Sequence, residues 1–192
     1  MVAVKLLPKG REGLLLMSTY LRRLFGAFAL DPGAYEDVEA AKGATIQAAA
    51  TVLLSSAAAG IGSQGFGGQP WAVVPLTLVT LIAWAAWALL TFEVGTRLLP
   101  GARTHSDVGE LLRTIGFAAA PGLLLALGVL PGVTVPIFVM ASVWMLAAMI
   151  VAVRQALDYD NTAHAVAVCI FGWGLAVSLV VIAGSFLATP VE

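Results

Sequence analysis

The sequence predicts an all-α integral membrane protein with five transmembrane helices, arranged as two hairpins plus one helix, behind an N-terminal amphipathic helix. Hydrophobic residues make up 60% of the chain and charged residues 11%, against about 45–50% and 25% in soluble domains. Residues 43–92, 114–153 and 161–191 contain no Asp, Glu, Lys or Arg. Because a helix needs about 20 apolar residues to cross a bilayer, the first two stretches can each cross twice and the third once.

Helix-breaking residues divide both long stretches near their middle. The first is interrupted by the Gly-rich segment 62–70, which ends in Pro70, and the second by Pro131-Gly132. We therefore expect one membrane domain over residues 43–192, behind a cytoplasmic N-terminal segment over residues 1–42. Its five spans are predicted at about residues 44–61, 71–93, 110–130, 134–157 and 163–187.

The ten Lys and Arg residues all fall on one side of this predicted topology. The two hairpin turns and residues 189–192 contain none of them. Since positively charged short loops stay in the cytoplasm during insertion, we expect a cytoplasmic N-terminus and an external C-terminus. The outer face then has only two short turns and a short tail, so activity is expected in the membrane or at its cytoplasmic face.

Residues 12–29 have the pattern of an amphipathic helix. With helical spacing, apolar side chains recur on one face at Leu14, Met17, Leu21, Leu24, Phe25 and Phe28. Arg22 and Arg23 argue against a membrane span, because a charge near the bilayer centre costs at least ~2.5–3.5 kcal/mol. The apolar face can lie in the acyl boundary of the membrane, as an interfacial helix does. Alternatively, it can pack on the protein's own cytoplasmic loops, and the sequence favours neither placement.

A second, short helix is expected directly after the first. Asp31 is a suitable N-cap and Pro32 suits the first helical position, so this helix should continue through Ala34 to about Lys42. Near its start, where the helix dipole favours negative charge, lie Glu36, Asp37 and Glu39.

Small and polar residues form a stripe along the predicted first span. Gln47, Thr51 and Ser55 lie on one face of it, together with alanines and a glycine spaced by three or four residues. Such residues let two helices approach closely and form hydrogen bonds across the contact. A polar stripe can also line a transport path, but this one carries no ionisable group, so we predict a role in helix packing.

The predicted third span contains Pro121 near the middle of the membrane. Proline cannot donate to the carbonyl group four residues back, here that of Phe117, so a kink is expected. Gly116 precedes the proline and offers a small contact surface, so both residues are predicted to serve helix packing. A freed carbonyl group can instead serve as a binding element, although a kink that only adjusts packing is the commoner case.

Charged side chains gather at the cytoplasmic ends of the predicted helices. Three acid–base pairs have a spacing that places both members on one helical face, namely Glu93 and Arg97, Glu110 and Arg113, and Arg154 and Asp158. We favour the interpretation that these pairs neutralise charge at the membrane boundary. The alternative is a polar pocket for a proton, a metal ion or a lipid headgroup, which they would form together with His105, Asp107, Asp160 and His164.

Recognised catalytic patterns are missing from the sequence. The glycines between residues 62 and 68 lack the Lys and Ser/Thr of a phosphate-binding loop, and neither G-x-S-x-G nor H-E-x-x-H occurs. The single Cys169 excludes an intramolecular disulfide and a cysteine metal cluster, and the net charge of −1 gives no reason to expect nucleic-acid binding. We therefore predict no enzymatic activity and no cofactor.

Residues 111–121, LLRTIGFAAAP, combine an Arg, a Gly-aromatic-Ala step and a Pro at the start of the predicted third span. The Pro131-Gly132 turn, a Trp-containing fourth span that ends near Arg154 and an Ala-rich fifth span accompany this segment. Over roughly residues 35–187 the chain thus resembles the Yip (Ypt/Rab-interacting protein) domain family, and more specifically its bacterial branch.

The resemblance implies a multi-pass protein of the bacterial plasma (inner) membrane. Eukaryotic members of the family bind small GTPases and help to shape or traffic membranes. The longer cytoplasmic segment and the Asp-Leu-Tyr-Gly-Pro-type motif of those members do not occur in this sequence, so GTPase binding is not carried over. The family supplies no catalytic residues.

These features predict a non-enzymatic membrane protein that acts as a scaffold or accessory subunit through helix–helix contacts. Its expected partners are the lipid bilayer and either further copies of the chain or another membrane protein. The alternative is a small transporter or channel for an ion, a metabolite or a lipid. A stoichiometric protein partner would favour the scaffold, and a tightly held small molecule or lipid would favour the transporter.

Overall fold

The computed structural model describes residues 9–67, 69–99 and 107–172, and all regular structure within these ranges is helical. The long helices are α1 (Lys9–Phe28), α3 (Ala44–Gly62), α4 (Val73–Glu93) and α6 (Thr134–Ala156). The shorter α-helices are α2 (Pro32–Ala40), α5 (Val108–Ala118) and Thr162–Gly172. The predicted all-α fold is therefore confirmed for the part of the chain that the structure describes.

Short stretches of other helix types connect or extend these helices. The 3-10 turns η2 (Ser63–Phe66) and η3 (Pro70–Ala72) link α3 to α4, at the predicted break between the first two spans. A π-helical turn, η4 (Val94–Leu98), extends α4, and the 3-10 helix η5 (Ala120–Val129) continues α5.

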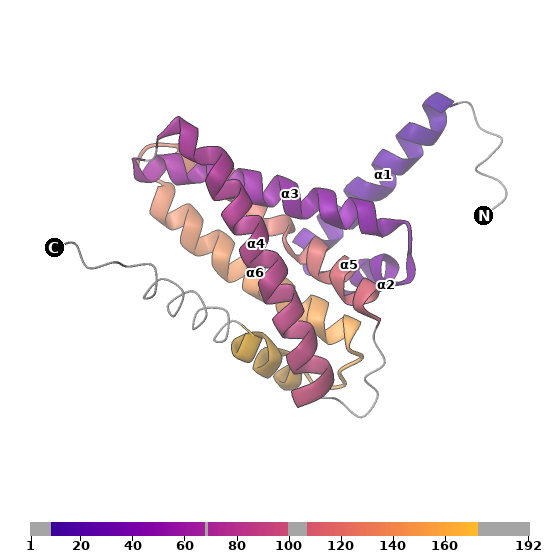
Figure 1. The fold of residues 1–192 in the computed structure, drawn as a ribbon. Helices are drawn as coiled ribbons and strands as arrows, with labels where there is room; N and C mark the ends of the chain where they lie inside the picture. The colour runs from indigo at the N-terminus through magenta and orange to yellow at the C-terminus, as the bar shows by residue number, and fades with distance from the viewer. Residues whose placement is uncertain (1–8, 68, 100–106, 173–192) are drawn as a thin grey trace.

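Among the described residues, four helical stretches are long and apolar enough to cross a membrane, namely Ala44–Gly65, Pro70–Leu98, Val108–Val129 and Thr134–Ala156. Consecutive stretches run in opposite directions, so α3 and α5 begin at the same end of the bundle at which α4 and α6 finish (Figure 1). We call this end, which carries Lys42, Arg97, Arg113 and Arg154, the basic end. The opposite end, with the turns at residues 63–72 and 130–133, is the turn end.

The predicted fifth span is described only at its beginning. The apolar helix Thr162–Gly172 starts where that span was predicted, and these described residues alone are too few for a membrane crossing. Residues 173–187 of the predicted span lie outside the described residues. The described helices are compatible with a membrane protein.

Pro121 changes the type of helix within the predicted third span. The α-helix α5 ends at Ala118, and the chain continues as the 3-10 helix η5, so the span predicted at residues 110–130 consists of two segments. Proline has no N–H for the α-helical bond to the fourth residue before it. After the proline the backbone hydrogen bonds reach only three residues back, as in a 3-10 helix. The N–H of Gly122 donates in this way to the carbonyl oxygen of Ala119 at 2.8 Å.

Helices α3, α5 and η5 form the inside of the bundle, and α4 and α6 lie outside them. α3 packs against η5, α4 and α5, while α6 packs against η5 and α5. Among the described residues, α4 contacts mainly α3 and, near its end, the helix Thr162–Gly172, and it leaves most of its surface bare. The small residues of α3 consequently face protein, since Ala48, Ser55 and Gly62 are buried whereas Leu53 and Leu54 are exposed.

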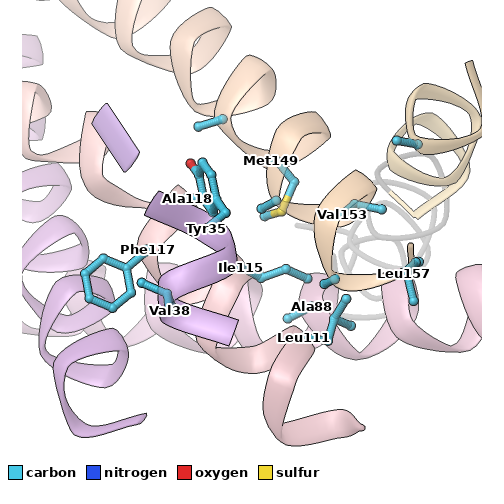
Figure 2. Packing of buried hydrophobic residues seen from close by; sticks show 14 of the residues in the cluster. Tyr35, Val38, Ala88, Leu111, Ile115, Phe117, Ala118, Met149, Val153 and Leu157 are labelled. Atoms are coloured by element: carbon cyan, nitrogen blue, oxygen red, sulfur yellow. The ribbon is translucent and has the colours of Figure 1, made fainter. Parts of the chain in front are cut away.

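Helix α2 shares a hydrophobic core with the basic-end halves of α5 and α6. Figure 2 shows Tyr35 and Val38 of α2 close to Ile115 of α5, with Met149 and Val153 of α6 in the same cluster. Tyr35 and Val38 are fully buried. Although α2 belongs to the predicted N-terminal segment, it therefore packs as part of the bundle.

Helix α2 begins where the sequence predicts and folds back on α1. Oδ1 of Asp31 accepts a hydrogen bond from the backbone N–H two residues on at 3.0 Å, and Pro32 occupies the first turn. Just before them, Leu30 has a φ of +61°, a left-handed conformation that is uncommon for a non-glycine residue. The two helices cross closely at Gly26, where a Cβ would lie 2.5 Å from the Cβ of Ala34.

Helix α1 consists of a docked half and a bare half. Near its end, Leu24 and Phe28 pack against the core, and Nε1 of Trp144 donates to the carbonyl oxygen of Phe28 at 2.8 Å. Towards its start, α1 projects away from the other helices (Figure 1). The other four residues of its predicted apolar face are 41–72% exposed, namely Leu14, Met17, Leu21 and Phe25.

Candidate functional site

A group of charged side chains surrounds Arg113 at the basic end. Arg113 lies on α5 and is only 5% exposed. Its Nη2 donates to the carbonyl oxygen of Glu39 at 2.7 Å, while its Nε has no hydrogen-bond partner among the described residues. The guanidinium thus lies at the carboxyl end of α2, where a positive charge is favourable, and holds α2 against α5.

The side chain of Glu39 is half-buried at the same place. Its pKa is raised to about 7, first by burial and then by the carboxylates of Asp158 and Glu110; the guanidinium lowers it, and Glu36 raises it slightly. Glu36 itself accepts a hydrogen bond from Nε2 of Gln155 on α6 at 2.9 Å. We call this group, which comprises Glu36, Glu39, Glu110, Arg113 and Asp158, the Glu39 site.

A second polar network ties α1 to α2 and α3. Nε of Arg23 lies 3.0 Å from Oδ2 of Asp37, and Nη1 of Arg23 donates to Oε1 of Gln47 at 2.9 Å. Arg22 reaches the same carboxylate at 3.1 Å, but its side chain is 71% exposed, against 10% for Arg23. The hydrogen bond from Arg23 holds the pKa of Asp37 below its ordinary value, so this pair stays charged.

Two other predicted packing residues of α3 form hydrogen bonds across helix contacts. Oγ of Ser55 donates to the carbonyl oxygen of Ala119 at 2.7 Å, directly before the break at Pro121. Oγ1 of Thr51 lies 3.2 Å from the hydroxyl of Tyr20 on α1. The polar groups of the α3 stripe are therefore bound to neighbouring helices.

The backbones of α3 and of the α5–η5 segment are in close contact. A Cβ added to Gly116 would lie 2.8 Å from the Cβ of Ala48, and one added to Gly62 would collide with the carbonyl group of Leu125. The predicted packing residue Gly116 thus lies at a helix crossing. At these two crossings there is no space for a side chain.

Other members of the predicted cytoplasmic cluster have partners of their own. Glu93 and Arg97 form an ion pair at 3.0 Å, at the π-helical end of α4. Nε of Arg154 lies 3.4 Å from the carbonyl oxygen of Tyr159, and the ring of His164 packs on the ring of Tyr159 with centroids 5.5 Å apart. Arg154 and His164 adjoin the turn after α6, whereas the ion pair of Glu93 and Arg97 lies at the end of α4.

The loop before α5 supplies a helix cap. Asp107 is the N-cap of α5, and its N–H donates to the carboxylate of Glu110 at 3.1 Å, which completes a capping box. His105 lies outside the described residues. Within the described ranges, no group of three or more His, Cys, Asp and Glu side chains could hold a metal ion.

The structure brings Glu110, Arg113 and Asp158 of the predicted cluster together and adds Glu36 and Glu39, which sequence reasoning missed. The spacing that puts the two glutamates on one face of α2 is visible in the sequence. Their approach to α5 depends on the left-handed turn between α1 and α2, and no motif predicts that turn.

Tyr159 joins the end of α4 to the turn after α6. Its hydroxyl lies 2.9 Å from the carbonyl oxygen of Gly95 and 2.7 Å from that of Leu99. Both acceptors belong to the π-helical turn or to the residue directly after it. Sequence analysis did not single out this contact, because neither the turn nor the tyrosine belongs to a recognised pattern.

Comparisons of the chain with protein-family models, curated proteins and solved structures found no match. The geometry of the chain itself offers two features with functional meaning. One is the Glu39 site, where burial and neighbouring carboxylates raise the pKa of a glutamate. The other is the contrast between a closely packed interior and the bare outer surface of α4.

Proposed function

We propose that the chain is a non-enzymatic scaffold or accessory subunit of the bacterial plasma membrane, which acts through helix–helix contacts. The proposal includes five spans and a basic end that faces the cytoplasm, as the preference of Lys and Arg for cytoplasmic loops favours. It also includes membership of the Yip domain family, which rests on the sequence resemblance alone.

The observation that carries the proposal is the backbone contact between α3 and η5. A transport path needs polar groups that line an accessible space. Here the hydroxyl groups of Thr51 and Ser55 bind Tyr20 and the backbone of Ala119, and glycines bring the helices together. These polar side chains could have lined a transport path, but they form hydrogen bonds that hold the bundle together.

One surface that remains for partners among the described residues is the bare face of α4. Large apolar side chains on this face are 53–68% exposed, namely Val74, Leu78, Ile82 and Leu89. Ala83 and Ala86 are also exposed, and small residues of this kind let a second helix approach closely within a membrane. This combination favours α4 as the contact helix.

The same proposal assigns the bare half of α1 to the cytoplasmic membrane surface. This half projects sideways from the bundle (Figure 1) and exposes Leu14, Met17 and Leu21. An interfacial helix places such side chains in the acyl boundary and keeps its charges at the headgroups. Arg22, which is exposed beside this face, suits that arrangement.

One observation favours the alternative, a small transporter or channel. Nε1 of Trp84, Nε1 of Trp87 and Oγ1 of Thr91 are buried on α4 without a hydrogen-bond partner among the described residues. Trp87 and Thr91 adjoin Gly172, so Nε1 of Trp87 and Oγ1 of Thr91 lie between α4 and the helix Thr162–Gly172. Buried unpaired polar groups are rare, and a polar substrate between these helices would pair them.

Photocrosslinking in native membranes tests the scaffold. A photoreactive amino acid replaces Ile82 on α4 or, as a matched control, the equally exposed Val143 on α6. We expect position 82 to form adducts with protein, whether a second copy or a partner, and position 143 to form adducts with lipid alone. Protein adducts at neither position would contradict the proposal.

A flux assay tests the alternative. Wild-type protein and Thr91→Val are reconstituted into proteoliposomes and screened with ions and small metabolites. We expect no flux from either protein. Reproducible flux through the wild type that is lost in a stably folded Thr91→Val variant would replace the scaffold by a transporter.

A further inference from the structure

The Glu39 site contains more acidic groups than its single cation can balance. Glu39 lies within electrostatic range of Glu36, Glu110 and Asp158, as well as of Arg113. These groups come from α2, from α5 and from the turn after α6. If all four carboxyl groups were ionised, three negative charges would remain at a place where α2 is pressed against the bundle.

Lys42, two residues after α2, is exposed and is not among the groups that shift the pKa of Glu39, and the arginines near α2 are engaged elsewhere. On α1, Arg22 and Arg23 both bind Asp37, at 3.1 and 3.0 Å. On α6, Nε of Arg154 lies against a backbone carbonyl group in the turn that follows. The buried guanidinium of α5 donates to the backbone oxygen of Glu39, and among the described residues no ion pair includes the Glu39 carboxylate.

We propose that the Glu39 site binds a proton, and that this proton keeps α2 docked on α5 and α6. While the Glu39 carboxyl is neutral, α2 can bury its carboxyl end beside the other acids. When the proton leaves, the new charge is repelled by its neighbours and favours water, which it gains as α2 loosens from α5.

The docked state of α2 also determines where α1 lies. Asp37 of α2 binds both arginines of α1, and the Cβ of Ala34 lies next to Gly26. Loosening of α2 would therefore move α1 with its bare apolar face. The proton-dependent docking of α2 is independent of the scaffold proposal, because it needs only the contacts between α1, α2, α5 and α6.

The direction of the pH dependence follows from the pKa of Glu39. Docking raises this pKa from an ordinary value of 4.5 to about 7, so docked α2 holds the proton more tightly than undocked α2 does. By linkage, the stabilisation is fully present below the ordinary pKa. It is lost progressively as the pH rises towards 7, and docking is weakest above that value.

Hydrogen–deuterium exchange of the full chain in nanodiscs tests the proposal. The backbone amides of α2 are followed between about pH 5.5 and 8.5 and corrected for the intrinsic pH dependence of exchange. In the wild type we expect their protection to fall by about tenfold or more over this range and to level off above about pH 7. In Glu39→Gln, which stays neutral, protection should remain high at every pH.

Two further variants keep the test decisive. Glu93→Gln, the matched control, removes a carboxylate that pairs with Arg97 on α4, and it should behave like the wild type. Asp158→Asn removes one negative neighbour of Glu39 at an exposed position with a φ of +49°, which asparagine tolerates well. We expect Asp158→Asn to lower the pH at which protection levels off, which a merely structural role of Asp158 would not do.

Each result supports or overturns the proton site. Protection that does not change with pH in the wild type would overturn it, as would an equal pH dependence in wild type and Glu39→Gln. If Glu39→Gln does not fold, protection that levels off at the same pH in Asp158→Asn as in the wild type would still overturn it.

Discussion

Helices α3 and α4 are neighbours of similar length that meet opposite surroundings. In the most apolar part of the stretch that contains α3, the mean hydropathy is 1.5 and 44% of the residues are buried. In the same part of the stretch that contains α4, the mean hydropathy is 2.1 and 6% of the residues are buried. The more apolar helix is therefore the less buried one. In a water-soluble protein the order would be reversed, because burial there follows the hydrophobic effect.

The difference indicates that the helices with more small and polar residues are the inner helices of this bundle. The other two stretches agree. The mean hydropathy is 1.6 with 67% of the residues buried in the most apolar part of Val108–Val129, and 2.3 with 22% of the residues buried in that of Thr134–Ala156. Lipid tails are as apolar as leucine, so leucine gains little by leaving them. Glycine, alanine and serine gain close backbone contact and hydrogen bonds by packing on one another.

The largest effect is expected where α3 meets η5. In Gly62→Ala the new methyl group would collide with the carbonyl group of Leu125, and backbone cannot turn aside as a flexible side chain can. We expect a loss of about 3 kcal/mol or more, at the upper end of overpacking effects. Reversible unfolding in mixed detergent micelles measures it.

Gly43→Ala is the control at the other end of the same helix. A Cβ at Gly43 meets nothing within 4 Å, so stability should change by less than about 0.5 kcal/mol. If Gly62→Ala is as well tolerated as Gly43→Ala, the backbone contact is not what holds α3 inside.

The packing of α3 could be predicted because it depends on local spacing. Small residues three and four positions apart identify the inner face, and stretches without charge locate the spans. The Glu39 site could not be predicted, because it depends on a left-handed Leu30 that turns α2 back onto α1. Pro121 indicated a break in the third span, but nothing in the sequence showed that 3-10 bonding would continue for the length of η5.

A second comparison contrasts the two adjacent arginines of α1. Arg23 is enclosed between Asp37 and Gln47, whereas Arg22 is mostly exposed. Removing a buried partner leaves polar groups unpaired and costs about 3–5 kcal/mol in a dry interior. Because Asp37 is partly exposed and keeps Arg22, we expect about 2 kcal/mol for Arg23→Met.

Arg22→Met should cost less than about 0.5 kcal/mol, as exposed ion pairs do. Both variants are compared by thermal unfolding in the same detergent. Equal losses from the two substitutions would mean that α1 is not docked through Arg23.

A smaller effect is expected from the hydrogen bond between α3 and the break at Pro121. Ser55→Ala removes the donor to the carbonyl oxygen of Ala119. Hydrogen bonds between membrane helices contribute about 0.6 kcal/mol on average and up to about 1.7 kcal/mol, so we expect about 1 kcal/mol. Ser142→Ala, at an exposed position on α6, should change nothing measurable, and a loss of equal size there would remove the special role of Ser55.

The smallest effect is expected on the bare face of α4. Ile82→Ala leaves a gap that lipid can fill, so the stability of the isolated chain should change by less than about 0.5 kcal/mol. Val52→Ala on α3 removes less volume but empties a buried position, where lost packing contacts are not replaced, and should cost about 1 kcal/mol. The larger side chain would thus matter less than the smaller one, which is the contrast between α3 and α4 in a single pair of variants.

Unfolding of both variants at two protein concentrations measures it. If Ile82→Ala proves the more damaging, and its effect grows with protein concentration, the bare face of α4 is covered by a second copy in the folded state. If the damage is the same at both concentrations, the difference in burial between the two helices does not govern their stability.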